Sequence, residues 1–246
     1  MTTAALDLER LASWLEQNLP GFKGPLTAEK FNRGQSNPTF RLSAPSGAYV
    51  LRRKPPGVLL KSAHAVDREF RVQKALAATD VPVARMHVLC EDDDVIGSAF
   101  YIMDLVEGRN FDDPRIQEVN TATRSAIYDE MNRVLAAIHS VDLEAAGLAD
   151  YGPAGNYYRR QIDRWTKQYR ASETGTIADM DELIAWLDQN IPEDDGRRTL
   201  VHGDYRIDNM LFAKDSPECV AVLDWELSTL GHPFADLAAL IMQWRC

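Results

Sequence analysis

The pattern of apolar residues predicts an α+β protein of two lobes, a small antiparallel sheet followed by a mostly helical part. Short apolar runs typical of strands fill residues 30–105, and one amphipathic helix separates them. Beyond Gly108 the period changes to 3.6 and amphipathic segments dominate. Strands first and helices afterwards favour two packed units. We therefore expect an N-terminal lobe at residues 1–103, a hinge at 104–108 and a helical C-terminal lobe at 109–246.

The N-terminal lobe is expected to begin with a helix. Leu8, Leu11 and Leu15 recur at helical spacing, and Leu19-Pro20-Gly21 ends that helix. Turn-rich segments then separate short β-like runs, which indicates hairpins or a meander. The expected strands cover 30–31, 39–42, 49–52, 86–89 and 99–105, and a second helix covers 66–78.

The C-terminal lobe is expected to begin with a long helix near Asn120, marked by apolar residues at 127, 131, 134, 135 and 138. Further helices are predicted at 156–169, 177–189 and 234–244, and short strands at 200–201, 210–212 and 220–223. The last helix is mostly apolar and still runs where the sequence stops. We expect from this that the lobe is incomplete.

The composition favours an intracellular globular protein. Of 246 residues 45% are hydrophobic, and the formal net charge is −10, which disfavours a nucleic-acid-binding surface. No apolar run reaches membrane-spanning length, the first ten residues lack a secretory-signal core, and the three cysteines have no metal-ligand spacing. We expect a cytoplasmic protein with reduced thiols and neither a nucleic-acid nor a membrane partner. The oligomeric state is not predicted.

The strongest chemical signal is the segment HGDYRIDN at 202–209, which places Asp204 and Asn209 on one tight loop. Asp224 follows the next apolar run, in the segment VLDWE. Phosphoryl transfer from a nucleotide needs one carboxylate that orients the acceptor hydroxyl and takes its proton. It also needs a second carboxylate and an amide oxygen that hold Mg²⁺. The spacing is that of kinase catalytic loops. The alternative is that Asp204 and Asn209 only cap turns.

A kinase site also needs a cation on the third strand and an acid on the following helix. Alternation along residues 49–52 puts Val50 and Arg52 on one face, so Arg52 lies where a lysine is usual. Glu69 is its natural partner on the helix. An arginine can bind phosphate with two hydrogen bonds but does not replace a lysine in every respect. Arg53 and Lys54 are adjacent alternatives, or a solvated basic edge.

Two further segments are candidates for nucleotide contact. The loop that contains Gly34, Ser36 and Asn37 joins two strands, and its glycine permits close approach to phosphates. An ordinary hairpin turn has the same composition. Met103 leads into the expected hinge, where backbone groups of Asp104 and Leu105 would receive the adenine edge.

Three motifs together resemble the aminoglycoside phosphotransferase and choline kinase-like superfamily: HGDYRIDN at 202–209, VLDWE at 222–226 and GHPFADLA at 231–238. FNRGQSNPTFRL at 31–42 and YVLRRKPPG at 49–57 resemble one subgroup, the phosphotransferase domains related to the N-terminal part of certain acyl-CoA dehydrogenases. The resemblance implies a protein-kinase-like fold, and it extends from about Glu29 to the end of the chain.

The resemblance also implies roles and ligands. Asp204 would be the catalytic base, and Asn209 and Asp224 the Mg²⁺ ligands. His202 and Asp236 would support the catalytic loop. ATP would donate its γ-phosphate to a hydroxyl of a small molecule, with a hydroxyacyl or acyl-CoA compound as the expected acceptor. Related proteins continue with further helices that help to form the acceptor pocket.

Two other functions stay open. A catalytically impaired nucleotide-binding protein would be consistent with the arginine at position 52 and with an incomplete lobe. A metal-dependent hydrolase would use His202, Asp204, Asp208 and Asp224 as ligands, although it would need more histidines near the metal than this segment offers.

Overall fold

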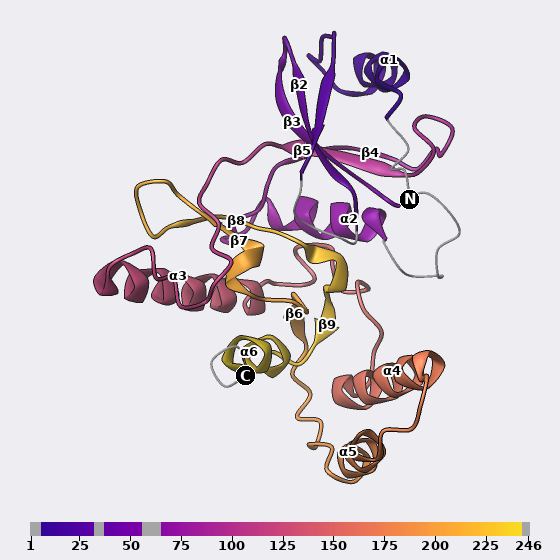
Figure 1. The fold of residues 1–246 in the computed structure, drawn as a ribbon, viewed down its shortest axis with the longest axis vertical. Coiled ribbons are helices and arrows are strands. Elements are labelled where there is room, and N and C mark those ends of the chain that lie inside the picture. The colour runs from indigo at the N-terminus through magenta and orange to yellow at the C-terminus, as the bar shows by residue number, and fades with distance from the viewer. Residues whose placement is uncertain (1–5, 32–36, 56–64, 243–246) are drawn as a thin grey trace.

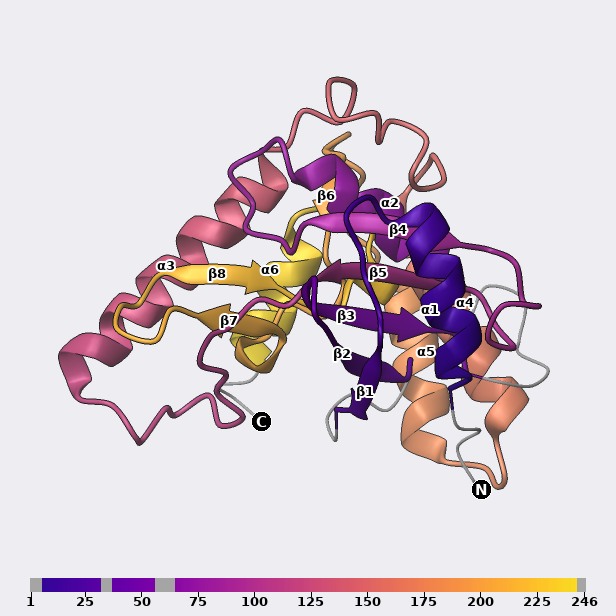
Figure 2. The same cartoon turned by 90° about the horizontal axis from the view of Figure 1, so that it is seen from above.

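A computed structural model describes residues 6–31, 37–55 and 65–242, and it confirms the α+β class (Figure 1). A five-stranded antiparallel sheet lies at one end of the molecule, and helices with short strand pairs form the rest (Figure 1); Figure 2 looks down on the sheet from above. Residues 104–108 lead from the sheet toward the helical part. The boundaries expected for the lobes and the hinge stay a prediction.

The sheet is built from nearest neighbours along the chain, except at one edge. Its strand order is β1-β2-β3-β5-β4, with every pair antiparallel. The strands are β1 (Thr27–Lys30), β2 (Thr39–Ala44), β3 (Gly47–Arg53), β4 (Met86–Cys90) and β5 (Phe100–Asp104).

One helix covers each face of this sheet. α1 (Leu8–Asn18) buries Leu11 and Leu15 in a cluster that also contains Leu51 of β3. α2 (Val66–Leu76) packs Val66 on the other face, against β4 and β5. Because side chains alternate along a strand, Arg52 points away from Leu51 and toward the α2 face. This alternation delivers a charged residue to the inner side of the sheet.

The helical part surrounds two small strand pairs. β6 (Thr199–Val201) pairs with β9 (Thr229–Gly231), and β7 (Met210–Phe212) pairs with β8 (Cys219–Val222). Single 3₁₀ turns precede β7 and β9, at Ile207–Asn209 and Trp225–Leu227. The main core contains α3 (Thr121–His139), which buries Ile127, Met131, Val134, Leu135 and Ile138 as its period predicts.

Three other helices bury less. α4 (Tyr157–Ser172) and α5 (Ala178–Gln189) pack on each other, at the end of the molecule away from the sheet (Figure 1). Both have exposed tryptophans, Trp165 and Trp186. α6 (Phe234–Met242) buries Asp236 and Leu240 and exposes much of its remaining apolar surface.

Apart from small shifts in bounds, the predictions for two strands and one side chain differ from the structure. The first strand lies at Thr27–Lys30 instead of 30–31, and β9 was not predicted because its three residues include a single large apolar side chain, that of Leu230. Arg53 is buried and donates to the carbonyl of Ile96 at 3.3 Å, so its interpretation as a solvated edge was wrong. None of the helices in the described part of the chain has the length and apolar character needed to cross a membrane.

The packing of α1 predicts a specific loss. Leu15→Ala should lower the free energy of unfolding by about 2–5 kcal/mol, because the side chain is fully buried and truncation leaves a cavity. Gln17→Ala, on the exposed side of the same helix, should stay within about 0.5 kcal/mol of the wild type. Urea denaturation measures both. Similar losses in the two variants would contradict the packing.

Candidate active site

The loop after β6 is held by a buried carboxylate. Asp236, in the first turn of α6, accepts hydrogen bonds of 2.8 Å from the backbone N–H groups of His202 and Gly203. His139 of α3 lies 3.1 Å from the same carboxylate. Asp236 has no exposed surface, so these partners compensate for its burial. The residue expected to support the loop is therefore in contact with it.

His202 is fully buried, and both of its ring nitrogens have partners. Nε2 lies 2.9 Å from the carbonyl oxygen of Leu223, and Nδ1 accepts from the backbone N–H of Asp204 at 3.2 Å. The ring packs on Trp225, with centroids 4.6 Å apart. Burial lowers the pKa of His202, because the protonated ring loses its hydration. A neutral ring with Nε2–H as donor satisfies both contacts, so His202 joins the loop to the strand that precedes Asp224.

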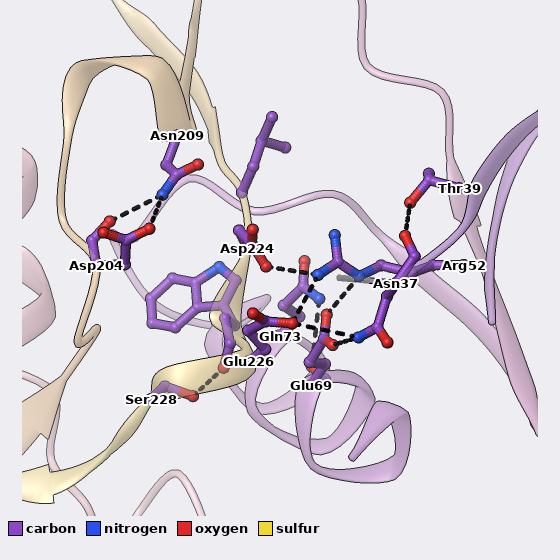
Figure 3. Close-up of polar contacts among 12 residues, drawn as sticks. Asn37, Thr39, Arg52, Glu69, Gln73, Asp204, Asn209, Asp224, Glu226 and Ser228 are labelled. Carbon is purple, nitrogen blue, oxygen red and sulfur yellow. Dashed lines mark hydrogen bonds and ion pairs between the residues drawn. The ribbon is translucent and has the colours of Figure 1, made fainter. Parts of the chain in front are cut away.

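Asp204 and Asn209 are in direct contact, as Figure 3 shows. Asn209 Nδ2 donates to the carboxylate and to the carbonyl oxygen of Asp204, both at 2.9 Å. Arg206 Nε lies 3.3 Å from the other carboxylate oxygen, Oδ1. The side-chain amide oxygen of Asn209 is thus turned away from Asp204. This is the orientation that a cation ligand needs.

Asp224 occupies a backbone conformation that is rare for a non-glycine residue, with φ 63° and ψ 61°. It follows β8, whose neighbour Leu223 donates its N–H to the carbonyl of Asn209 at 2.8 Å. A backbone hydrogen bond therefore links Asn209, one predicted metal ligand, to the residue directly before Asp224, the other. Such left-handed residues often mark functional positions, because surrounding contacts must hold them.

Arg52 of β3 brings together three carboxylates, one from α2 and two from the segment after β8 (Figure 3). Its NH2 group lies 2.5 Å from Asp224 and 3.5 Å from Glu226, and its Nε lies 2.9 Å from Glu69 of α2. The Nε–H is not aligned with Glu69, so that contact is an ion pair rather than a hydrogen bond. The sequence prediction that Glu69 pairs with Arg52 agrees with this geometry.

The carboxylates of this cluster outnumber its guanidinium by three to one. Burial opposes the charge on Arg52, but the neighbouring acids outweigh it and raise the pKa of Arg52. Burial also opposes the charge on Glu69 and raises its pKa to about 7, although the neighbouring Arg52 acts in the opposite direction. The cluster has excess negative charge, and a further cation beside Asp224 would relieve it. This is the electrostatic condition for a metal site.

Glu69 is also held by neutral groups. Asn37 Nδ2 donates to Oε1 at 2.7 Å, and the Tyr101 hydroxyl donates to Oε2 at 3.1 Å. Gln73, one turn further along α2, lies 3.4 Å from that hydroxyl. Asn37, predicted to contact phosphates, thus binds Glu69, and neither Tyr101 nor Gln73 was among the predicted site residues. Gly34 and Ser36, the other residues expected over the phosphates, lie outside the described residues.

A cavity of about 520 Å³ joins these groups to the expected hinge. Arg52, Asn209 and Asp224 line it, as do residues 103–108, which include Met103, Asp104 and Leu105. The backbone N–H of Asp104 already donates to the carbonyl of Arg85 at 2.9 Å. Adenine would therefore need the carbonyl of Asp104 and a later N–H of the segment. The remaining lining is largely apolar and includes Val50, Ala84, Leu211 and Leu223.

The assignment of the chain to a family rests on nearly its whole length and not on the site alone. The model of the phosphotransferase enzyme family matches residues 27–245. The chain belongs to this family. The resemblance on which the sequence analysis relied is therefore confirmed.

Curated relatives are longer proteins. Acyl-CoA dehydrogenase family member 11 of Mus musculus is 48% identical over 238 residues, covering 95% of this chain and 31% of the relative. Family member 10 of the same species is 51% identical over 215 residues, covering 87% of this chain and 20% of the relative. The chain thus spans about a third or less of the length of these relatives.

Solved structures agree with the fold. A Ralstonia eutropha protein classed with the aminoglycoside phosphotransferases is 53% identical, with a TM-score of 0.87, covering 98% of this chain and 71% of its own. The aminoglycoside phosphotransferase APH(4)-Ia, solved with ADP and hygromycin B, is 20% identical with a TM-score of 0.64, covering 95% of this chain and 76% of its own. The second likeness shows the kinase-like fold alone.

The close approach at Gly203 predicts a difference between two glycines. Gly203 and Gly97 have φ of +86° and +85°, so alanine at either position pays about 1–2 kcal/mol. Only at Gly203 would the added Cβ lie 2.7 Å from a carbonyl oxygen, that of Leu227. Gly203→Ala should therefore be the less stable variant by a further 1–3 kcal/mol, roughly. Urea denaturation compares them, and equal losses would contradict the close approach.

The buried histidine predicts a pH dependence. In the unfolded chain His202 titrates near about 6.5, whereas burial lowers its pKa in the folded protein. Below pH 6.5 the unfolded state therefore binds more protons than the folded state. The contribution of the neutral ring to the free energy of unfolding is fully present above pH 6.5 and is lost on acidification, by up to about 1.4 kcal/mol per pH unit. Unfolding free energies at pH 5.5, 6.5 and 7.5 should fall more steeply in the wild type than in His202→Gln. Parallel curves would exclude a buried neutral ring.

Proposed function

We propose that the chain transfers the γ-phosphate of ATP to a hydroxyl of a small molecule in a Mg²⁺-dependent reaction. One observation carries the proposal: a single cavity is lined by the hinge segment and apolar side chains, and also by Arg52, Asn209 and Asp224. An adenine and its triphosphate need these two environments in this order. A cytoplasmic location stays part of the proposal.

The described residues fit Mg²⁺ when phosphate oxygens complete its shell. Asn209 and Asp224 offer an amide and a carboxylate oxygen, the hard donors that this ion prefers. No group of three His, Cys, Asp or Glu side chains able to hold a metal occurs within the described ranges, so nucleotide oxygens would supply further ligands. When bound, the ion would neutralise charge that develops on the transferring phosphoryl group.

Asp204 would act on the acceptor. Its carboxylate is held at one oxygen by Asn209 and at the other by Arg206, and it remains about one-third exposed. A hydroxyl within hydrogen-bond reach would be oriented by this carboxylate and would lose its proton to it as the new P–O bond forms. Arg52 would turn from Asp224 to the phosphates, where a guanidinium binds oxygen pairs well.

The acceptor we propose is a hydroxyacyl or acyl-CoA compound. The support is the identity of 45–51% to acyl-CoA dehydrogenase family members 10 and 11, whose names refer to acyl-CoA chemistry. This step of the proposal rests on those relatives. The family model supports phosphotransfer, and the acceptor class is the finer part of the proposal.

The structure bears differently on the two alternative functions, a metal-dependent hydrolase and a nucleotide-binding protein without turnover. A hydrolase with His202 as a metal ligand conflicts with the contacts of its ring, because Leu223 and Asp204 occupy both nitrogens. A nucleotide-binding protein without turnover is favoured by one observation, the short contact between Arg52 and Asp224. That contact must open before either side chain meets a nucleotide.

Binding of Mg·ATP should stabilise the wild type and not Asp224→Asn. Mass action raises the stability of a folded state that binds ligand, and asparagine tolerates the left-handed backbone while it removes the charge. Thermal unfolding at millimolar ATP, with and without Mg²⁺, measures the shift. Asp215→Asn, which removes an exposed carboxylate in the turn after β7, should keep the full shift. No shift in a folded wild type would exclude the active-kinase proposal.

Turnover separates the kinase from the impaired alternative. Asp204→Asn should keep the Mg·ATP stabilisation but lower ADP release with hydroxylated acyl compounds by about 10²–10⁴-fold, the usual contribution of a general base. Enzyme-coupled detection of ADP measures the rate. A wild type that binds Mg·ATP and releases no ADP with any hydroxyl acceptor would support the impaired protein.

A further inference from the structure

A second cavity lies in the helical part, apart from the nucleotide cavity. It has a volume of about 220 Å³, several times the roughly 30 Å³ share of one water molecule. The start of α4, the loop before β6 and the end of β9 form its walls, at the place where Figure 1 shows β6 and β9 near α4. Arg160, Arg197, Arg198 and His232 are among its lining residues.

Two of these arginines keep their full positive charge. Arg160 donates to the carbonyls of Ala154 and Leu230, at 3.1 and 3.2 Å, and also to that of Gly155. Arg198 donates to the carbonyls of Ala149 and Gly152, at 3.1 and 2.9 Å. A carbonyl oxygen satisfies a guanidinium N–H but does not neutralise its charge. Neither side chain forms an ion pair within the described ranges.

The remaining charges nearly balance one another. Arg197 pairs with Asp195 at 2.6 Å, and bonds from the backbone and guanidinium of Arg197 lower the pKa of Asp195 to about 2. His232 is nearly buried and contacts the Tyr158 hydroxyl at 2.9 Å and Asp195 at 3.3 Å. Asp194 also lines the cavity. Three guanidiniums against two carboxylates leave a net positive hollow.

The positive hollow does not follow from composition, since the whole chain has a formal net charge of −10. The backbone carbonyls fix both guanidiniums before any ligand arrives, so little side-chain freedom would be lost on binding. Prearranged guanidiniums match the oxygen pairs of phosphates. The tyrosine hydroxyl of Tyr158 adds a polar group beside them.

We propose that this cavity binds a phosphate-type anionic group carried by the acceptor. Arg198 and Asp204 are six positions apart in the sequence, so their Cα atoms lie within about 22 Å of each other. One elongated molecule can thus place its hydroxyl at Asp204 and its anionic end among the arginines. The assignment of the group to the acceptor rests on the proposed function, whereas the anion site itself does not.

Titration with inorganic pyrophosphate tests the anion site. Isothermal calorimetry is done on the whole chain with the nucleotide cavity saturated by Mg·AMP-PNP, at an ionic strength held constant with sodium chloride. Arg198→Gln should weaken binding at least about tenfold, because it removes a charged hydrogen-bond donor. Arg198→Lys keeps the charge but loses the planar fork that the two carbonyls hold, so its affinity should lie between those of the wild type and Arg198→Gln.

Arg159→Gln is the matched control. It removes the same charge from the same region, but Arg159 pairs with Asp188 of α5 and does not line the cavity. Its affinity for pyrophosphate should equal that of the wild type. Equal loss in Arg159→Gln and Arg198→Gln, or no binding to the wild type, would overturn the proposal. Stabilisation by Mg·ATP should be unchanged in Arg198→Gln, so failure of the nucleotide site is recognised separately.

A second pair of probes identifies the source of the anion. Phosphopantetheine and pantetheine differ by one phosphate and contain no adenine. If the acceptor carries the group, phosphopantetheine should bind at least about tenfold tighter than pantetheine, and Arg198→Gln should abolish that difference. Equal affinity of the two probes in a protein that binds pyrophosphate would overturn the assignment to the acceptor.

Discussion

The site depends on one guanidinium that three carboxylates share. Arg52 comes from the sheet and Glu69 from α2, while Asp224 and Glu226 come from the segment after β8. Because the acids outnumber the cation and are partly shielded from water, Arg52 offsets much of the repulsion between their charges. This ionic contact joins the two parts of the molecule across the cavity. It also leaves excess negative charge where a metal with a triphosphate would be accommodated.

Much of the fold could be predicted because the apolar repeat of its main helices extends over many residues. The apolar positions of α1 and α3 recur over several turns, and the burial of Leu15 and Ile138 follows directly from them. Short elements were harder to predict from their own sequence. β9 has three residues, one of them a glycine, and is fixed by its pairing with β6 rather than by its own pattern. Arg53 is buried because its guanidinium reaches a loop carbonyl, a tertiary contact that alternation does not encode.

Contacts of the candidate site between residues close in sequence could be predicted, whereas contacts between distant segments could not. Asp204 and Asn209 lie five residues apart, and their contact follows from one loop. The support of Glu69 by Tyr101 depends on the strand register that pairs Tyr101 with Arg52. Gln73 could have been found, since it follows Glu69 by four residues on one helix. The contact of Glu226 with Arg52 joins residues far apart in sequence, and no spacing rule indicates it.

The backbone N–H and C=O groups of Leu223 both form hydrogen bonds with the loop at residues 202–209. Its N–H donates to Asn209 and its carbonyl accepts from His202, so the pair formed by Asn209 and Asp224 is fixed through the main chain. Arg52 reaches Asp224 only through side chains. A rocking of the sheet against the helical part would therefore break the side-chain contact first. If the proposed function holds, such a motion would let nucleotide exchange while Asn209 and Asp224 keep their positions relative to each other.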